Sequence, residues 1–239
     1  MELVDEETWE PDLVTCPSSP LSAYTPRNDV LMCDGGGFHA FWYSLGKGSV
    51  LHVHTQHTLG WSSGAMAAVL LVALPHIDLG AVITAALETK RDVQIGLGRL
   101  HYVVAYFLDK LLPHNAHILC EGTLGIILCD PRRCFRARVE TSWSSRTQLI
   151  DCIIASTYVP GFVGMTLTDP LYRCVDGGFS TDLRSLRAGV WTTRGPPAGF
   201  LESFRPITSE HALDLFQRGR RDAINQMGMD ALATCSGRA

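Results

Sequence analysis

The sequence predicts an α/β fold in which a mainly parallel central sheet is covered by helices on both faces. Short apolar runs typical of strands alternate along the chain with longer segments in which apolar residues recur at helical spacing. Three Gly-rich turns follow expected strands, at residues 35–37, 60–64 and 176–178. Because the carboxyl ends of parallel strands share one edge of a sheet, we expect the three turns to meet in a common site.

Each expected strand is a short apolar run that ends near a turn signal. Val30–Cys33 ends at three successive glycines, and Val50–Thr58 precedes the second Gly-rich turn. The other strands are expected at Gly125–Cys129, Phe135–Thr141 and Tyr172–Val175.

The expected helices are longer, with apolar residues three and four positions apart. Ser209 is the expected N-cap of the last helix, and residues 188–206, rich in glycine and proline, are expected to form a loop. The helices are expected at Phe38–Gly46, Ala65–Leu74, Leu79–Glu88, Gly96–Leu112, Gln148–Ser156 and Ser209–Met227.

The composition is that of a globular chain of 239 residues and limits the classes of function. Apolar residues make up 46% and the net charge is −4, so the chain is too apolar and too weakly charged to be disordered. Lysine and arginine number 20 against 24 acidic residues, so no excess of positive charge is available for phosphates, and we expect no nucleic-acid partner.

The cysteine pattern and the N-terminus predict a cytoplasmic protein. Eight cysteines are scattered without a CxxC pair, and the first ten residues are acidic, unlike the basic start of a secretory signal. The longest apolar run, Ala65–Leu74, is far shorter than the roughly 20 residues that span a bilayer. Residues 1–28 carry four prolines and are expected to be a loose arm, followed by one domain at 29–232 and a tail at 233–239.

Gly60-Trp61-Ser62-Ser63-Gly64 has the GxSxG spacing of a nucleophile elbow and lies between an expected strand and an expected helix. Such a tight turn lifts the central serine out of the sheet, and small flanking residues permit it. An ordinary turn between strand and helix fits the same residues. We expect Ser62, at the central position, to be the nucleophile if the turn is an elbow.

The other two Gly-rich turns have residue types that could complete such a site. Gly35, Gly36 and Gly37 let backbone N–H groups approach a ligand, as in an oxyanion hole. Asp176 opens the turn with Gly177 and Gly178, which by itself indicates only a turn. No nucleotide-binding glycine pattern is present, and no cofactor is expected.

His52, His54 and His57 form a local histidine cluster, and the first two would share one face of a strand. No carboxylate or cysteine nearby completes a ligand set, so we expect no metal site and interpret these residues as partly buried or surface histidines.

The chain resembles the patatin-like phospholipase family, and within it the adipose triglyceride lipase and adiponutrin branch. The matching motifs are Asp34-Gly35-Gly36-Gly37-Phe38, Gly60-Trp61-Ser62-Ser63-Gly64, Val175-Asp176-Gly177-Gly178, Leu111-Leu112-Pro113, Gly122-Thr123-Leu124-Gly125-Ile126, Ala155-Ser156-Thr157-Tyr158-Val159-Pro160 and Gly219-Arg220-Arg221-Asp222-Ala223. Their order and spacing cover the chain from about Val30 to about Met227.

The resemblance implies a three-layer α/β/α sandwich and a Ser62–Asp176 dyad that works without histidine. By the same match, Gly35, Gly36 and Gly37 line the oxyanion hole. The implied activity is hydrolysis of carboxylic esters in acylglycerols or phospholipids through an acyl-enzyme, with peripheral contact with membranes or lipid droplets. Two alternatives remain: a catalytically impaired protein that binds lipid, and a lipid acyltransferase.

Several residues depart from the family pattern. His39 and Ala40 stand where a basic residue and a glycine are usual, Trp61 is bulky for an elbow, and Asp182 replaces an asparagine. These departures favour the alternative of a weakened activity.

Overall fold

The structure is a computed structural model that describes residues 29–93, 96–195 and 207–236. The expected N-terminal arm, part of the expected loop at 188–206 and the last three residues lie outside the described residues. The division into arm, domain and tail therefore stays a prediction.

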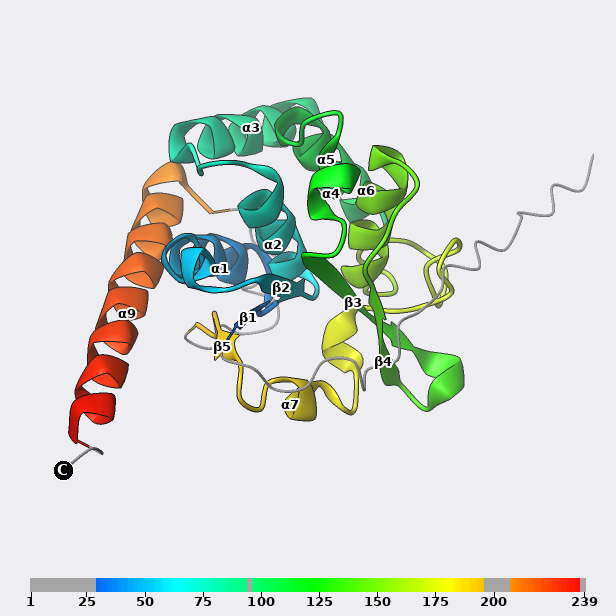
Figure 1. The fold of residues 1–239 in the computed structure, drawn as a ribbon. Helices are drawn as coiled ribbons and strands as arrows, with labels where there is room; N and C mark the ends of the chain where they lie inside the picture. The colour runs from blue at the N-terminus through cyan, green and yellow to red at the C-terminus, as the bar shows by residue number, and fades with distance from the viewer. Residues whose placement is uncertain (1–28, 94–95, 196–206, 237–239) are drawn as a thin grey trace, which may run out of the picture.

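The described residues form an α/β fold, as the sequence predicts (Figure 1). The strands are β1 (Val30–Cys33), β2 (His57–Gly60), β3 (Leu124–Asp130), β4 (Arg136–Glu140) and β5 (Trp191–Thr192). The α-helices are α1 (Gly37–Leu51), α2 (Ser63–Ala73), α3 (Leu79–Asp92), α4 (Leu100–Leu111), α5 (Ala116–Cys120), α6 (Arg146–Ser156), α7 (Leu183–Leu186) and α9 (Ser209–Ser236). Short 3-10 turns are η2 (His52–His54), η3 (Pro131–Arg133) and η4 (Gly177–Phe179).

The strands form one mixed sheet in the order β4-β3-β2-β1-β5. β1 pairs in parallel with β2 and β5, β2 pairs in parallel with β3, and β4 runs antiparallel to β3 at the edge. Because β1 and β2 lie side by side, in register from Val30 opposite His57 to Cys33 opposite Gly60, the turns that follow them emerge together.

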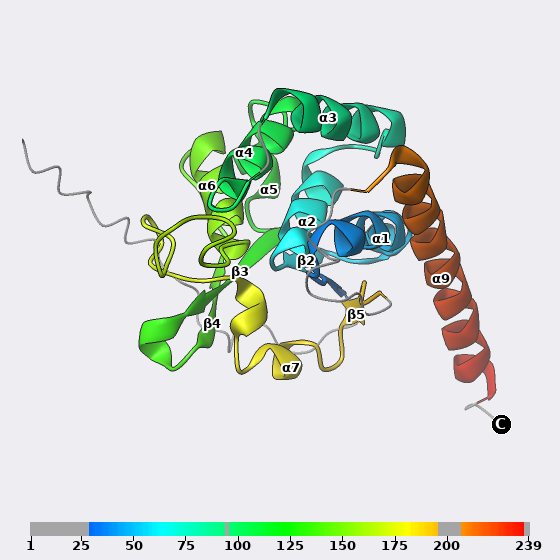
Figure 2. The same ribbon diagram turned by 180° about the vertical axis from the view of Figure 1, so that it is seen from behind.

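Alternation along the strands gives the sheet two apolar faces. Leu31 and Cys33 of β1 face a large core built with α1, α2, α4, α6 and α9. Val30 and Met32 face a smaller cluster that includes Leu183 of α7. Figure 2 shows the same asymmetry from behind: most helices lie on one side of the sheet, and α7 lies on the other.

α2 is the central helix of the large core, and nearly all of its residues are buried. Five of its first six residues are small, so the sheet and the other helices can approach that part closely. A helix buried all round has little freedom to shift, and α2 therefore fixes the position of the turn before it.

α1 and α9 pack closely, as both ribbon views show. A Cβ added at Gly46 would lie 2.8 Å from the Cα of Phe216, and one added at Gly219 would lie 2.8 Å from the backbone N of Lys47. The Tyr43 hydroxyl donates a hydrogen bond of 2.7 Å to Asp222, which fixes the register of the two helices.

The strand expected at Val50–Thr58 is wrong over most of its length. α1 continues to Leu51, η2 follows, and only His57 and Thr58 lie in β2. Leu51 is 1% exposed and packs in the large core, whereas Val53 is 74% exposed. Burial of Leu51 on the inner face of α1 stabilises the helix here, although the alternation of residues at 50–58 also fits a strand.

The expected strand at Tyr172–Val175 is also wrong, because only Val175 forms a bridge, with Cys129 of β3. The expected loop at 188–206 contains the two-residue strand β5. α9 extends to Ser236 rather than Met227. Thr208 rather than Ser209 is the residue whose hydroxyl accepts a hydrogen bond, of 3.2 Å, from the N–H of His211 at the start of α9.

We expect Gly46→Ala to destabilise the protein by about 1–3 kcal/mol, because the added methyl group must push α9 away from α1. Gly228→Ala is the matched control: a Cβ there meets nothing within 4 Å, so the change should stabilise α9 by up to about 1 kcal/mol. Urea unfolding of the two variants measures both effects. Equal stabilities for the two variants would contradict the close packing of the helices.

Candidate active site

The turn between β2 and α2 has the backbone geometry of a nucleophile elbow. β2 ends at Gly60 and α2 begins at Ser63, so Ser62 lies at the apex. Ser62 has φ 53° and ψ −136°, a conformation that L-residues rarely adopt. This backbone conformation directs the Ser62 side chain away from the sheet and places it at the N-terminus of α2.

The two flanking glycines permit this turn because backbone crowds both positions. A Cβ on Gly60 would lie 2.7 Å from the Cα of Ala65, and a Cβ on Gly64 would lie 2.6 Å from the carbonyl carbon of Cys33. Any side chain at Gly64 would therefore separate α2 from the end of β1.

Ser156, at the end of α6, holds the strained residue in place. Its hydroxyl accepts a hydrogen bond of 3.0 Å from the N–H of Ser62 and donates one of 2.7 Å to the carbonyl of Ile127 in β3. Ser156 is fully buried, so this bridge is shielded from water. It links the elbow to both its neighbouring strand and a helix.

Asp176 is brought to Ser62 by the segment after β3. Val175 exchanges two backbone hydrogen bonds with Cys129, and the N–H of Asp176 donates to the carbonyl of Tyr158 at 2.8 Å. The Asp176 carboxylate interacts with the Ser62 hydroxyl and accepts a hydrogen bond of 2.8 Å from the N–H of Gly178. The two residues, 114 positions apart in the sequence, thus lie close enough to interact.

Burial raises the pKa of Asp176 from 3.8 to about 6. The hydrogen bonds from Ser62 and Gly178 favour the charged form and lower the pKa, but they offset the effect of burial only in part. A carboxylate with this pKa is ionised at neutral pH and is a stronger base than an exposed aspartate.

The glycine loop after β1 is fixed by Asp34. The N–H of Asp34 donates to the Thr193 hydroxyl at 2.9 Å, Thr193 donates to the Ser44 hydroxyl at 2.8 Å, and Ser44 donates back to the Asp34 carbonyl at 3.0 Å. The Asp34 carboxylate accepts a hydrogen bond of 2.8 Å from Nε of Arg187. These contacts fix the loop from the edge strand and from both faces of the sheet.

The glycines of this loop place a helix N-terminus beside Ser62. Gly36 and Gly37 have φ of 141° and 71°, values that favour glycine, and α1 begins at Gly37. The first N–H groups of a helix have no carbonyl partner within it and can bind an anion. Gly35 approaches Ser62 so closely that an added Cβ would lie 2.6 Å from the serine Cβ.

Trp61, bulky for an elbow, fits because glycines surround its ring. A Cβ on Gly35 would lie 2.7 Å from the ring, and a Cβ on Gly178 would clash with it. The Arg187 guanidinium lies over the same ring, 5.5 Å from its centroid. The glycine loop, the elbow and the aspartate turn therefore pack on a single indole.

The three other departures from the family pattern all make contacts in the structure. Asp182 accepts a hydrogen bond of 2.8 Å from the N–H of Ala137, which ties the segment after the aspartate turn to β4. The His39 ring packs edge-on against His211 of α9, with centroids 4.9 Å apart. Ala40 lies one turn after Gly36, where an added Cβ on Gly36 would be 3.0 Å from the alanine methyl.

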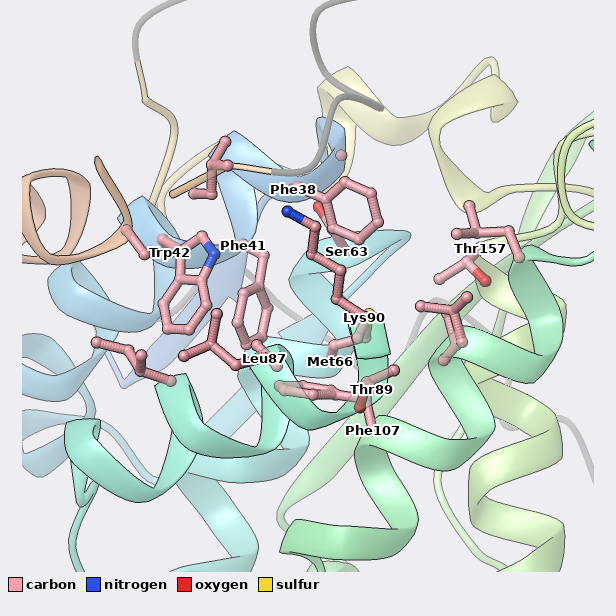
Figure 3. A pocket seen from close by; sticks show the side chains of 18 of the residues that line it. Phe38, Phe41, Trp42, Ser63, Met66, Leu87, Thr89, Lys90, Phe107 and Thr157 are labelled. Carbon is pink, nitrogen blue, oxygen red and sulfur yellow. The ribbon is translucent and has the colours of Figure 1, made fainter. Parts of the chain in front are cut away.

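Ser62 lines one end of a mostly apolar cavity that is open to solvent. α1, α2, α3 and α4 supply most of the wall, as the close view in Figure 3 shows. The apolar residues of the wall are Phe38, Phe41, Trp42, Met66, Ile83, Ala86, Leu87, Leu100, Val103, Val104, Phe107, Ile207 and Ala212. Such a wall suits a hydrocarbon chain.

His52 and His54 do not share a strand face, because both lie in η2. His52 is within hydrogen-bond distance of Thr58, and His57 of the Gly122 carbonyl. Within residues 29–93, 96–195 and 207–236, no group of three histidine, cysteine or acidic residues could hold a metal ion. In the same part of the chain, no helix is both long and apolar enough to cross a bilayer.

The structure thus brings together Ser62, Asp176 and the glycines at 35–37, which the sequence places on three separate turns. The sequence analysis gave no role to Ser156, Arg187 or the cavity wall of α3 and α4. The motif around Ser156 was visible in the sequence, but nothing in it indicated a hydrogen bond to Ser62.

Three curated human proteins are similar to this chain. "1-acylglycerol-3-phosphate O-acyltransferase PNPLA3" is 28% identical over 177 residues, which are 68% of this chain and 36% of the relative. "Patatin-like phospholipase domain-containing protein 4" is 31% identical over 96 residues, 40% of this chain and 38% of the relative. "Patatin-like phospholipase domain-containing protein 2" is 29% identical over 165 residues, 62% of this chain and 32% of the relative. No family model matches the chain.

The α/β fold with its mostly parallel sheet is consistent with the patatin-like class. The three relatives, at 28–31% identity, support the resemblance to the patatin-like phospholipase family and its adiponutrin and adipose triglyceride lipase branch. They support a family of lipid hydrolases or acyltransferases. The matched part of the chain spans about a third of the length of these relatives.

We expect Asp176→Asn to make the protein more stable at neutral pH. Because the folded pKa of about 6 lies above 3.8, the contribution of Asp176 to stability is fully present below pH 3.8 and is lost as pH rises through 6. The loss approaches about 3 kcal/mol at pH 7, and the Asp176→Asn variant escapes it.

Urea unfolding between pH 4 and pH 8 measures this difference, with exposed Asp214→Asn as the control. The stability gain of Asp176→Asn over wild type should shrink toward pH 4, and Asp214→Asn should show no such trend. A gain that is independent of pH would contradict a buried, ionised Asp176.

Proposed function

We propose that the chain is a serine lipid acyl hydrolase that cleaves carboxylic esters of acylglycerols or phospholipids. The observation that carries the proposal is the contact between Ser62 and a buried Asp176 of raised pKa at one end of an apolar cavity. No cofactor enters the mechanism.

The reaction begins with attack of the Ser62 hydroxyl oxygen on the ester carbonyl carbon. The hydroxyl proton passes to the Asp176 carboxylate, which then gives it to the leaving alcohol as the carbon–oxygen bond breaks. Water attacks the acyl-enzyme in the second half, and Asp176 accepts the proton of the water and returns it to the Ser62 oxygen as the bond between that oxygen and the acyl carbon breaks. Burial supports this role because it makes the carboxylate more basic.

The negative oxygen of each tetrahedral intermediate would be stabilised by the backbone N–H groups of the glycine loop. The N-terminus of α1 at Gly37 and that of α2 at Ser63 both line the cavity beside Ser62. Two helix dipoles then act on the same oxygen. Donors fixed before the reaction cost no reorganisation, and each contributes about 3 kcal/mol.

Acyl transfer is the second candidate function. One relative is named as an acyltransferase, and the same acyl-enzyme serves both reactions. Whether an alcohol or water resolves that intermediate decides between them. Adding monoacylglycerol to an acyl-enzyme that carries a labelled acyl group distinguishes the two reactions. Transfer yields a labelled diacylglycerol, and hydrolysis yields a labelled free fatty acid.

Peripheral contact with a membrane or lipid droplet is part of the proposal. Large apolar side chains are exposed on two adjoining loops, with Leu97 at 74%, Met165 at 81% and Leu167 at 85%. The loops are tied by the hydrogen bond from the N–H of Gly98 to the Phe162 carbonyl. Leu100, two residues past Gly98, lines the cavity, so lipid contact here would lie near the substrate.

We expect the wild-type protein to react with a fluorophosphonate probe, and Ser62→Ala to abolish labelling. Ser63→Ala is the matched control, because Ser63 also lines the cavity but its side chain makes no hydrogen bond to the described residues. Asp176→Asn should slow labelling by about 10²–10⁴-fold. Labelling of Ser62→Ala, or wild-type rates in Asp176→Asn, would overturn the dyad.

The pH dependence of the wild-type labelling rate gives a further check. The rate should rise through about pH 6, where Asp176 loses its proton and becomes the base. A rate that is flat between pH 5 and pH 8 would contradict Asp176 as the base.

A further inference from the structure

The cavity beside Ser62 is mostly apolar and carries a charged side chain at one point on its wall. Among the described residues that line it, Lys90 of α3 is the one with a charged side chain. Figure 3 shows the Lys90 side chain running from α3 toward the end of the cavity where Phe38 and Ser63 are labelled. Lys90 is also exposed to solvent, which places it at the mouth.

The carboxylates near Lys90 on its own helix already have partners. Glu88 pairs with Lys110 of α4 at 2.8 Å, and Asp92 pairs with Arg91 at 2.6 Å and accepts a hydrogen bond from Tyr106 at 2.8 Å. Lys90 forms no ion pair with any residue that the structure describes. Its positive charge is therefore available to a ligand.

The side chain of lysine suits this position for a physical reason. Its four methylene groups can lie along an apolar wall while the ammonium group stays in water. A single-chain lipid has the same division, with a hydrocarbon chain and a polar head. A ligand whose chain fills the cavity would bring its head to the mouth, beside the ammonium group.

We propose that Lys90 binds the anionic head group of a single-chain lipid whose chain occupies the cavity. The group is a carboxylate or a phosphate, so the ligand is a fatty acid anion or a lysophosphatidate. Charge-assisted hydrogen bonds to such oxygens are about twice as strong as neutral ones. This inference rests on the proposed function only in using the same cavity, because binding requires no turnover.

With Lys90 at its mouth, the cavity would prefer anionic lipids to neutral ones, a preference that apolar side chains cannot provide. A fatty acid anion formed at Ser62 would be retained after hydrolysis, so the product would inhibit the enzyme. A lysophosphatidate would be held with its one free hydroxyl group at the mouth of the cavity. Neutral lipids of the same chain length gain neither effect.

The test is a set of equilibrium affinities measured on the full chain by displacement of a fluorescent fatty acid, below the micelle concentrations of the ligands. Oleate is paired with oleyl alcohol, and 1-oleoylglycerol 3-phosphate with 1-oleoylglycerol. Lys90→Gln and Lys90→Met remove the charge, and Lys90→Arg keeps it. Arg133→Gln is the control, since it removes an exposed charge of η3 that does not line the cavity and forms no ion pair with the described residues.

We expect Lys90→Gln and Lys90→Met to weaken binding of at least one anion about tenfold and to leave the neutral partner unchanged. Lys90→Arg and Arg133→Gln should bind the anions as wild type does. A loss for oleate alone identifies the carboxylate, and a loss for the phosphate lipid alone identifies the phosphate. An equal loss for anionic and neutral ligands, or no loss for either anion, overturns the proposal.

Failure of this inference is distinguishable from failure of the proposed function. A protein whose anion affinity depends on Lys90 but which takes no fluorophosphonate label keeps the subsite and refutes the hydrolase. A protein that is labelled at Ser62 but binds anions independently of Lys90 keeps the hydrolase and refutes the subsite.

Discussion

The backbone of Ser62 is held in a conformation that costs on the order of 1–3 kcal/mol, and much of the structure serves to maintain it. Ser156 satisfies its N–H, Gly64 lets α2 reach the end of β1, and the buried α2 prevents the turn from relaxing. These contacts come from helices α2 and α6 and from strands β1 and β3. The elbow is therefore a property of the whole core rather than of five residues.

A second constraint is the crowding of three turns around one indole ring. Trp61 occupies the space that side chains at Gly35 and Gly178 would need, and Arg187 covers the ring while pairing with Asp34. The glycines and the tryptophan thus depend on one another. A smaller residue at position 61 would leave a void between the turns, which explains how an unusual residue fits a turn that otherwise follows the common pattern.

Patterns of short range gave the strand–turn–helix order at Ser62, the glycine loop and the aspartate turn, because each depends on a few adjacent residues. The same reasoning failed at Val50–Thr58, where the residues fit two periods and burial of Leu51 decides between them. Partners such as Ser156, Arg187 and Thr193 lie 94, 153 and 159 positions from the residues they contact. A pattern of adjacent residues cannot reveal such distant partners. It also cannot reveal a cavity wall that several separate helices build together.

The packing of α1 against α9 has a consequence for the chain during its synthesis. A domain emerges from the ribosome N-terminus first, at about 5–20 residues per second. α1 emerges early, yet the residues that cover it, Ala212, Leu215 and Phe216, come near the end. A nascent chain therefore holds an uncovered apolar surface for most of its elongation, and translation errors that stop the ribosome before α9 would release a product prone to aggregate.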